Sequence, residues 1–418
     1  MLLGEKLHIL RNKARMPQRL IAEALSIDIP MYSRMERGER PIRKEHIKIL
    51  ANIFKTDETE LLTLWLADQV KDVLKDNNEL IRNVLNIAKN DIGEMGKKKK
   101  IKVFEAFAGY GGASFGLNKA GINHSIVGYS EVDNDAIELY EYNFPGIKNY
   151  GDITKIKEKR LPKFDLFTGG FPCQPFSTVG KRQGELDTRG TLFGDIVRIC
   201  ECKQPKYILL ENVKGLSVGK QKPTFEKILS ELKRIGYDVR YAILNSKNYG
   251  IPQNRERLWI FGYLGELPDS FELVPPQIVL QYHLKDFLDK NPNEDLYRTQ
   301  KQIDRIKELH HIEKFDVQEP LCYDYYNRKL RTDAICMTVT PPEHNVIRIV
   351  EPIKNGKERV RKLSLEEHFR LMGFTMTDDY KEIKFPQTQD YTKLGRRAGN
   401  GWDVNLVSIL MKHIFSQI

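Results

Sequence analysis

The residue best placed to act as a nucleophile is Cys173. It lies in the segment GGFPCQPFS, residues 169–177, directly after an apolar run, Asp165 to Thr168, that is typical of a β-strand. A cysteine held between two prolines on a stiff loop is presented to solvent, and its thiolate is the reactive form. A packed thiol is the ordinary alternative for a lone cysteine, but the flanking prolines and glycines argue against it. The pattern predicts a nucleophile at the carboxyl end of a strand, where open α/β folds place their sites.

A glycine-rich turn earlier in the chain is suited to hold a nucleotide-like cofactor. The strand predicted at Ile101 to Phe107 leads into FAGYGG, residues 107–112, where glycines let a ligand approach the backbone at a helix N-terminus. Glu131 follows the next strand, at the place of a ribose diol. Asp152 ends a third predicted strand and is placed to accept from an adenine amine. An isolated acid after a strand is more often a helix cap, but the order and spacing of these residues favour the cofactor.

Taken together, these segments resemble the sequence blocks of the carbon-5 cytosine methyltransferases. The Pro-Cys-Gln segment is similar to the family's catalytic loop, and Glu211-Asn212-Val213 is similar to its catalytic acidic block. Three further blocks follow in the family's order: QNRER at 253–257, the segment 361–374, and Tyr391 with GNG at 399–401. The similarity covers about residues 101–262 and 346–418. So many blocks in register are specific for this family.

The resemblance implies how the site works. Cys173 attacks carbon 6 of cytosine, which makes carbon 5 electron-rich. Glu211, in its neutral form, hydrogen-bonds and protonates ring nitrogen 3, and Arg257 holds the base carbonyl oxygen. Asn212 and Arg255 are interpreted as supports for the acid and the loop. The implied cofactor is S-adenosyl-L-methionine, and the residues expected to contact it are Phe107, Gly109, Tyr110, Gly111, Gly112, Glu131, Val132, Asp152, Ile153, Pro172, Leu192, Asn400 and Gly401.

Double-stranded DNA is the implied substrate. A stacked cytosine hides carbon 6, so the base must leave the duplex, and in the family the loop after the cysteine, here 177–191, closes over it. Val179 stands where a well-studied relative has a small polar residue, and an apolar wedge serves in its place. The segment 265–345 occupies the position of the family's target-recognition domain. Residues expected to contact DNA in these two regions are Val179, Lys181, Arg189, Arg328 and Arg331.

The N-terminal region reads as helices and resembles the helix-turn-helix of the Xre/Cro repressors. Two short helices are predicted at Gln18 to Leu25 and Pro30 to Arg37. In that group the second helix enters the major groove, which here presents Met31, Tyr32 and Arg34. We hypothesise that this region represses the chain's own promoter. The alternative is a helical cap used for protein contacts.

From Ile101 onward, short β-rich runs alternate with helical segments, which predicts an α/β fold with a mostly parallel sheet between helices. The resemblance makes this a Rossmann-like methyltransferase core with a small target-recognition domain and an all-α helix-turn-helix domain. The predicted boundaries are 1–70 for the helix-turn-helix domain, 71–100 for a helical connector and linker, 101–264 for the catalytic domain, 265–345 for target recognition, and 346–418 for the return to the catalytic domain.

Composition sets broad limits on function. The formal net charge of +10 and pI of about 9.1 suit a polyanionic partner, although a basic surface can also serve solubility alone. Five scattered cysteines indicate no disulfide framework. Cys200 and Cys202 are separated by one residue, which is a tighter spacing than zinc sites usually have. We interpret both as core residues and predict no metal site. The absence of a long apolar run or a secretory signal indicates a cytoplasmic protein.

Two other functions remain open at this point. One is a tRNA cytosine methyltransferase, although a repressor-like domain reads duplex DNA. The other is a repressor whose methyltransferase core has lost activity, against which Cys173, Glu211 and Arg257 argue because all are intact. On target DNA we expect a monomer, with a dimer contact available to the N-terminal domain. The sequence does not identify the recognition motif, a partner restriction enzyme, or the base that removes the carbon-5 proton.

Overall fold

The structure is a computed structural model that describes residues 2–74, 100–172, 192–325, 327–341, 347–377 and 379–418. It divides into two compact units, Met1–Lys98 and Lys99–Ile418, each of which is described by itself. No described helix combines the length and the apolar composition that crossing a membrane requires.

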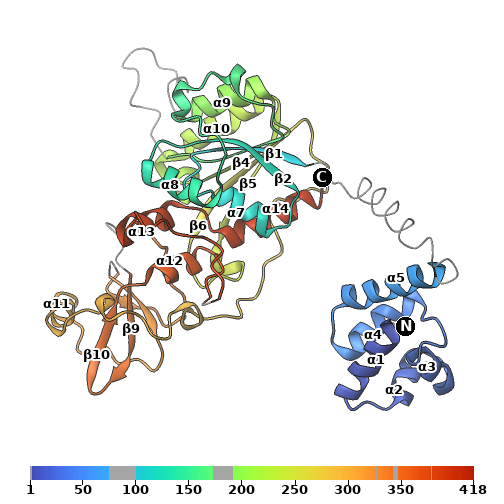
Figure 1. The fold of residues 1–418 in the computed structure, drawn as a ribbon. Coiled ribbons are helices and arrows are strands. Elements are labelled where there is room, and N and C mark those ends of the chain that lie inside the picture. Colours follow the sequence, from blue (N-terminus) through green and yellow to red (C-terminus); the bar gives the residue numbers. More distant parts are fainter. Residues whose placement is uncertain (1, 75–99, 173–191, 326, 342–346, 378) are drawn as a thin grey trace. The chain divides into compact units, whose positions relative to one another are not determined.

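The N-terminal unit is entirely helical in its described part (Figure 1). Its helices are α1 (Leu2–Lys13), α2 (Gln18–Ala24), α3 (Ile29–Glu36), α4 (Lys44–Phe54) and α5 (Glu58–Leu74). Asp28 caps α3 by accepting from the Met31 amide at 2.5 Å, and Pro30 occupies the first turn, where its missing N–H costs nothing. The predicted pair of short helices is therefore present to within a residue at each end.

The N-terminal helices enclose a small core of their own. Leu7, Ile21, Tyr32 and Leu50 are completely buried in it. The carboxylate of Asp68 accepts from the Leu2 and Leu3 amides (2.8 and 3.0 Å), which ties α5 to the start of α1. Because α5 satisfies orphan N–H groups of the first turn of α1, it belongs to this unit.

A six-stranded sheet forms the centre of the second unit, in the order β2-β1-β3-β4-β6-β5. The strands are β1 (Ile101–Ala106), β2 (His124–Ser130), β3 (Leu166–Gly170), β4 (Tyr207–Val213), β5 (Tyr237–Asn245) and β6 (Glu256–Leu264). The first four strands are parallel, and β6 and β5 run antiparallel to β4 and to each other. The predicted mostly parallel sheet is confirmed, with an antiparallel hairpin at one edge.

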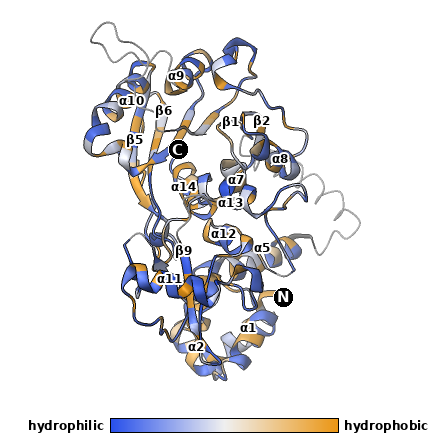
Figure 2. Ribbon diagram, turned by 90° about the vertical axis from the view of Figure 1, so that its left-hand side faces the viewer, coloured by the Kyte–Doolittle hydropathy of each residue, from blue (hydrophilic) through white to orange (hydrophobic). Residues whose placement is uncertain are grey.

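Successive apolar residues along each central strand face opposite layers. In β3, for example, Phe167 packs in the layer that holds α9 and α10, and Leu166 packs in the layer that holds α7 and α14. This continuous apolar pattern is typical of strands covered on both faces. The helices of the unit are α7 (Gly112–Lys119), α8 (Asn134–Asn143), α9 (Leu192–Lys203), α10 (Lys222–Arg234), α11 (Gln300–His310), α12 (Leu365–Leu371), α13 (Tyr391–Asn400) and α14 (Val404–Phe415). Along α10, hydrophobic and hydrophilic residues alternate as expected for a one-sided cover (Figure 2).

A second, four-stranded sheet has the order β10-β9-β7-β8 and packs against α11. Its strands are β7 (Leu321–Asp324), β8 (Lys329–Leu330), β9 (Ile347–Lys354) and β10 (Lys357–Arg361). The predicted boundary between 345 and 346 is wrong, because β9 pairs with β7 in antiparallel register and carries β10 with it. The chain therefore leaves the second sheet after Arg361 and returns to the first sheet through α12 and α13.

Candidate active site

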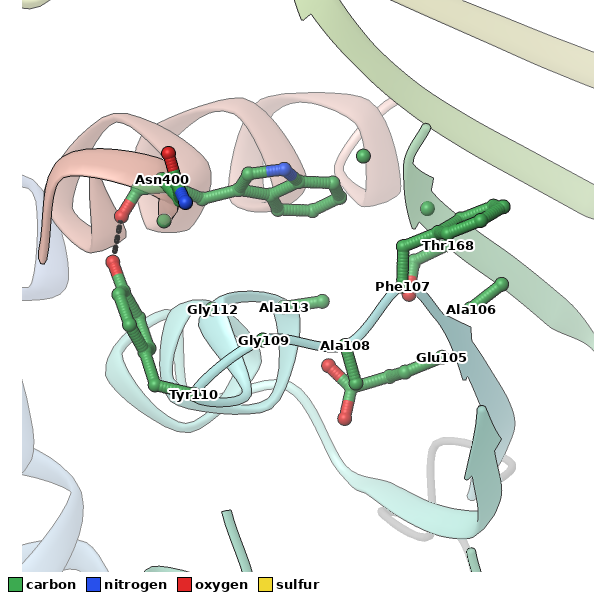
Figure 3. Close-up of a pocket in the computed structure, with 14 residues that line it drawn as sticks. Glu105, Ala106, Phe107, Ala108, Gly109, Tyr110, Gly112, Ala113, Thr168 and Asn400 are labelled. Atoms are coloured by element: carbon green, nitrogen blue, oxygen red, sulfur yellow. Dashed lines mark hydrogen bonds between the residues drawn. The ribbon is translucent and has the colours of Figure 1, made fainter. Parts of the chain in front are cut away.

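A pocket lies where the carboxyl ends of β1 and β3 meet the turn between α13 and α14 (Figure 3). Tyr110 from the glycine turn donates its hydroxyl proton to the carbonyl oxygen of Trp402, which joins segments almost three hundred residues apart. The lining residues are Glu105, Ala106, Phe107, Ala108, Gly109, Tyr110, Gly112, Ala113, Thr168, Gly169, Gly170, Asn400, Gly401 and Trp402. The parallel strands thus bring a sequence-predicted glycine turn and the last sequence block into one cavity.

The glycine turn has the backbone that its sequence suggested. Gly109 and Gly111 have φ angles of +56° and +90°, and Phe107 also lies in the left-handed region at +51°. A Cβ atom added to Gly109 would meet nothing within 4 Å, so the backbone is open there. Gly111 caps the N-terminus of α7. An open backbone beside a helix N-terminus can receive a polar ligand group.

Glu105, near the end of β1, hydrogen-bonds to the helix that follows the turn. Its buried carboxylate accepts from the Ser114 amide at 2.9 Å, from the Ser114 hydroxyl at 2.6 Å and from the Tyr140 hydroxyl at 2.5 Å. Burial raises the pKa of Glu105, and these hydrogen bonds oppose the rise. The side chain therefore joins β1 to the first turn of α7 and to α8.

Glu131 contacts the turn itself. One carboxylate oxygen accepts from the Gly109 amide at 2.9 Å, and the other accepts from the Val132 and Asp133 amides at 2.8 and 3.0 Å. Val132 is 66% exposed at the end of β2, an unusual place for an apolar side chain. The described contacts of Glu131 thus orient the turn, and Val132 offers an apolar surface next to it.

The third predicted strand does not end at Asp152. Asp152 is the cap of a short 3₁₀ helix (Ile153–Lys155) and accepts from the Thr154 amide and hydroxyl at 3.0 and 2.8 Å. These bonds lower the pKa of Asp152. Ile153 is 2% exposed and packs in the core below α9, so its side chain is not available to a ligand. The helix-cap interpretation applies here, because the chain turns before it can pair as a strand.

The structure separates the expected cofactor contacts into two groups. Phe107, Gly109, Tyr110, Gly112, Asn400 and Gly401 line the pocket. Within the described residues, those that do not line it are Gly111, Glu131, Val132, Asp152, Ile153, Pro172 and Leu192. The sequence analysis did not include Trp402 and Thr168 among the cofactor contacts, although Trp402 directly follows the GNG block.

Glu211 and Arg257 form an ion pair beside the pocket. Glu211 lies near the end of β4, and Arg257 lies on the adjacent strand β6, with 2.9 Å between its Nε and a carboxylate oxygen of Glu211. Their side chains are only 12% and 18% exposed. Burial raises the pKa of Glu211, and the positive charges of Arg257 and Arg255 oppose the rise. A carboxyl group with a raised pKa next to a fixed cation suits general acid chemistry on a polar ring.

Trp402 lies against this acid. A Cβ atom at Gly170 would be 2.8 Å from the indole nitrogen of Trp402 and 3.3 Å from a carboxylate oxygen of Glu211, so both atoms border the same point. A hydrogen bond from the indole lowers the pKa of Glu211. The Trp402 ring also packs edge-on against Trp259, with centroids 5.0 Å apart. One side chain therefore touches both the pocket and the acid.

Asn212 and Arg255 contact backbone around the site. Asn212 donates to the carbonyl oxygen of Phe171 at 2.8 Å. Arg255, which is 2% exposed, donates to the carbonyl oxygens of Val339 at 2.9 Å and Gly401 at 2.7 Å. Burial, aided by the nearby Arg257, lowers the pKa of Arg255 to about 9. Both side chains hold chain segments in place and leave the pocket to other groups.

Four predicted residues, Cys173, Val179, Lys181 and Arg189, lie outside the described residues. The described chain leads to the cysteine through β3, in which Gly170 pairs with Glu211 of β4. In the sequence, Cys173 thus comes three residues after Gly170, the strand partner of Glu211.

The predicted DNA contacts that the structure describes differ in how exposed their side chains are. Tyr32 is completely buried in the N-terminal core, so its prediction as a major-groove contact is wrong for the folded domain. Arg34 on the same helix is exposed, and Met31 is half-buried. In the second sheet, Arg328 is exposed at a turn with φ +52°, whereas Arg331 is ion-paired with Asp333.

The cysteine pair at 200 and 202 does not pack as predicted. Cys200 is completely buried in α9, but Cys202 is exposed, because residues two apart on a helix point to different sides.

Comparison with known proteins agrees with this geometry. Residues 101–416 match the family of C-5 cytosine-specific DNA methylases, and residues 2–64 match a helix-turn-helix domain. The chain is 34% identical over 328 residues to the type II methyltransferase M.BsuFI of Bacillus subtilis, covering 77% of this chain and 76% of the relative. It is 35% identical over 317 residues to M.NgoBI of Neisseria gonorrhoeae, covering 74% and 92%.

Solved structures show the same fold. A Spodoptera frugiperda DNMT2 mutant aligns with a TM-score of 0.57 at 20% identity, covering 76% of this chain and all of the other. The S. pombe Dnmt2 methyltransferase aligns with a TM-score of 0.54 at 19% identity, covering 76% and 99%. With its family match spanning most of its length, the chain belongs to the C-5 cytosine-specific DNA methylases and carries a helix-turn-helix domain at its N-terminus.

Proposed function

We propose that this enzyme methylates carbon 5 of a flipped cytosine within a short DNA motif, with Cys173 as nucleophile and S-adenosyl-L-methionine as methyl donor. The observation that carries the proposal is the buried Glu211–Arg257 ion pair, 2.9 Å across, next to the pocket that the glycine turn lines. A cytosine ring has an acceptor nitrogen next to a carbonyl oxygen. A buried acid can donate to that nitrogen, and the cation beside it can bind the oxygen. The relatives are type II methyltransferases, which supports a role in DNA modification beside a restriction enzyme.

The pocket fits the proposed cofactor. Open space over Gly109 admits a ligand to the backbone, and Asn400 and Gly401 form the opposite wall. We assign the ribose and adenine edges of the cofactor to Glu131 and to the exposed Val132, which follow β2. S-adenosylmethionine supplies an electrophilic methyl group when bound. The chain's own part is to hold that group at a fixed place relative to the acid.

The residues divide the remaining chemistry among them. The Cys173 thiolate bonds to carbon 6, and the electron pair displaced into the ring is met by a proton that Glu211 delivers to nitrogen 3. Arg257 holds the carbonyl oxygen of the base as charge builds there. After methylation, loss of the carbon-5 proton to water breaks the bond between sulfur and carbon 6, and nitrogen 3 returns its proton to Glu211. Cys173 leaves as a thiolate.

The enzyme acts on a base outside the helix, because a stacked cytosine does not expose carbon 6. Val179, Lys181 and Arg189 are proposed to contact the DNA around the vacated position, and Arg328 and Arg331 the flanking duplex. We place this reaction in the cytoplasm, with the chromosome.

The N-terminal domain is proposed to repress the enzyme's own promoter through α3. Arg34 is exposed on that helix, and Met31 is half-buried beside it. A footprint of the upstream DNA with the full chain and with Arg34→Ala tests this. Protection that the variant loses is expected, and an unprotected promoter would reject the regulatory role while leaving the enzymatic one intact.

Base-resolution methylation sequencing tests the main proposal. Plasmid DNA from cells that express the wild type, Cys173→Ser or Cys202→Ser is compared, and Cys202 is the matched control because its thiol is exposed on α9. We expect methylation of carbon 5 at one short motif in the wild type and the control, and none with Cys173→Ser. Unmethylated plasmid from folded wild-type enzyme, or methylation by Cys173→Ser, contradicts the proposal.

A further inference from the structure

An ion pair between Asp133 and Arg397 joins two segments that border the candidate cofactor pocket. Asp133 follows β2 and caps α8, and Arg397 lies near the C-terminal end of α13. The Nη1 atom of Arg397 is 2.9 Å from a carboxylate oxygen of Asp133. The side chain of Arg397 is 7% exposed and that of Asp133 is 40% exposed, so the pair is less screened by solvent than a surface ion pair.

The backbone of Asp133 continues this connection to the glycine turn. Its amide donates to one carboxylate oxygen of Glu131 at 3.0 Å. The other oxygen of Glu131 accepts from the Gly109 amide at 2.9 Å. Because a Cβ atom at Gly109 would meet nothing within 4 Å, Arg397 is linked through Asp133 and Glu131 to the place where the backbone is open to a ligand.

On α13, Arg397 lies close to the opposite wall of the pocket. It comes three residues before Asn400 and four before Gly401, and residues at these separations share one face of a helix. Asn400 and Gly401 line the pocket, and Figure 3 shows Asn400 across the cavity from Gly109. The ion pair therefore sets the distance between the end of α13 and the segment that contacts the glycine turn.

A second ion pair joins the same two helices one turn earlier on α13. Lys393 lies 2.9 Å from Asp135, but its side chain is 45% exposed. Within the described part of the chain, neither side chain of this pair is hydrogen-bonded to Glu131. The two pairs thus differ in burial and in their connection to the pocket, although both bridge α8 and α13.

We propose that the ion pair between Asp133 and Arg397 positions the two walls of the pocket for S-adenosyl-L-methionine, which makes Arg397 a positioning residue for cofactor binding. This inference rests on the proposed function, which supplies the identity of the cofactor. Its physical basis is preorganisation, because walls that are already fixed lose little freedom when the ligand binds. Without the pair, binding itself has to order the Glu131 segment against α13, and the cofactor binds more weakly.

The test is a calorimetric titration of the full chain with S-adenosylmethionine. We expect Arg397→Met to raise Kd about tenfold, which is about 1.4 kcal/mol, and Arg397→Lys to recover part of the loss because it keeps the charge. The carboxylate of Asp133 is exposed enough to be hydrated when its partner is removed. Lys393→Met is the matched control, since it removes the same charge from the same helix pair, and its Kd should stay near the wild-type value.

A double variant shows whether the two side chains act as a pair. Asp133→Asn removes the charge and keeps a residue that can cap α8. Added to Arg397→Met, it should weaken cofactor binding no further, because the interaction is already lost. Additive losses of affinity would overturn the proposal.

Hydrogen exchange of the cofactor-free protein gives a readout that does not depend on the ligand. The amides of Gly109, Val132 and Asp133 all donate to Glu131, and we expect them to exchange faster in Arg397→Met but not in Lys393→Met. In methyl transfer, the KM for the cofactor should rise while kcat at saturating cofactor is retained.

The remaining outcomes separate positioning from general support of the fold. An unchanged Kd in Arg397→Met overturns the proposal, with or without a lower unfolding temperature, and so does an equal loss of affinity in Lys393→Met. If the wild type binds the cofactor and Arg397→Met binds it equally well, only the positioning role fails. If the folded wild type binds no cofactor, the proposed function fails together with this inference.

Discussion

Replacing Trp402 with phenylalanine should alter the pH dependence of methylation. The substitution keeps an aromatic ring against Trp259 but removes the indole N–H that hydrogen-bonds Glu211. That bond favours the ionised carboxylate, so its loss raises the pKa of Glu211 further above its ordinary range. The neutral acid then persists to higher pH, and the alkaline limb of kcat/KM moves upward.

The size of the effect follows from the burial of Glu211, whose side chain is 12% exposed and therefore poorly screened by solvent. A hydrogen bond to a charged group contributes about 1.5–3 kcal/mol. The neutral carboxyl can still accept from the indole, so the difference between the two protonation states lies near the lower value. Since about 1.4 kcal/mol corresponds to a factor of ten, the proton affinity of Glu211 should rise about tenfold.

The assay is methyl transfer to a duplex across a pH series, with kcat/KM taken at each value. Trp259→Phe is the matched control, because it changes the same ring pair while its indole nitrogen is buried without a partner among the described atoms. We expect the alkaline limb to move in Trp402→Phe alone. Identical profiles for Trp402→Phe and the wild type would falsify the argument, and an equal movement in both variants would assign it to the smaller ring volume.

Three further substitutions test individual contacts. Glu105→Ala removes the acceptor for the amide and hydroxyl of Ser114, and we expect weaker S-adenosylmethionine binding by calorimetry and about 1–3 kcal/mol less stability in urea. Arg361→Met leaves Glu367 buried and unpaired, which should cost about 3–5 kcal/mol in urea unfolding, and adding Glu367→Gln should restore part of it. Tyr32→Phe removes a buried hydroxyl that has no described partner, so promoter affinity and stability should be unchanged, whereas a weaker footprint would return Tyr32 to the DNA surface.

The parts of the fold that are encoded locally could be predicted from the sequence. Consecutive apolar residues such as Leu166 and Phe167 indicate a strand that is covered on both faces. The glycines of the FAGYGG segment indicate a turn with positive φ angles. The strand β5 has a weaker local signal, because it lies at the edge of the sheet and exposes residues such as Arg240 and Tyr241. An edge strand with mixed polarity gives a weaker periodic signal than a central one.

Features that depend on pairing between distant segments could not be predicted. The boundary at 345 failed because only the pairing of β9 with β7 shows which sheet the strand joins. Tyr32 and Arg34 lie two residues apart on one short helix, and the fold alone decides that the tyrosine is buried. The segments at Arg298 and Lys362 lie side by side only because of backbone hydrogen bonds between stretches that have no sequence motif in common.

Several side chains from distant parts of the sequence contact the turn between α13 and α14. Arg255 fixes it by donating to the Gly401 carbonyl, Tyr110 fixes it by donating to the Trp402 carbonyl, and the Trp402 indole continues to Glu211. A wall of the proposed cofactor pocket and the proposed acid are thus parts of one buried network. Methyl transfer requires donor and acceptor atoms at near-contact distance, where small displacements are costly. A turn held from three sides keeps that distance fixed, which gives the buried Arg255, whose pKa is lowered, a structural role beside the proposed acid.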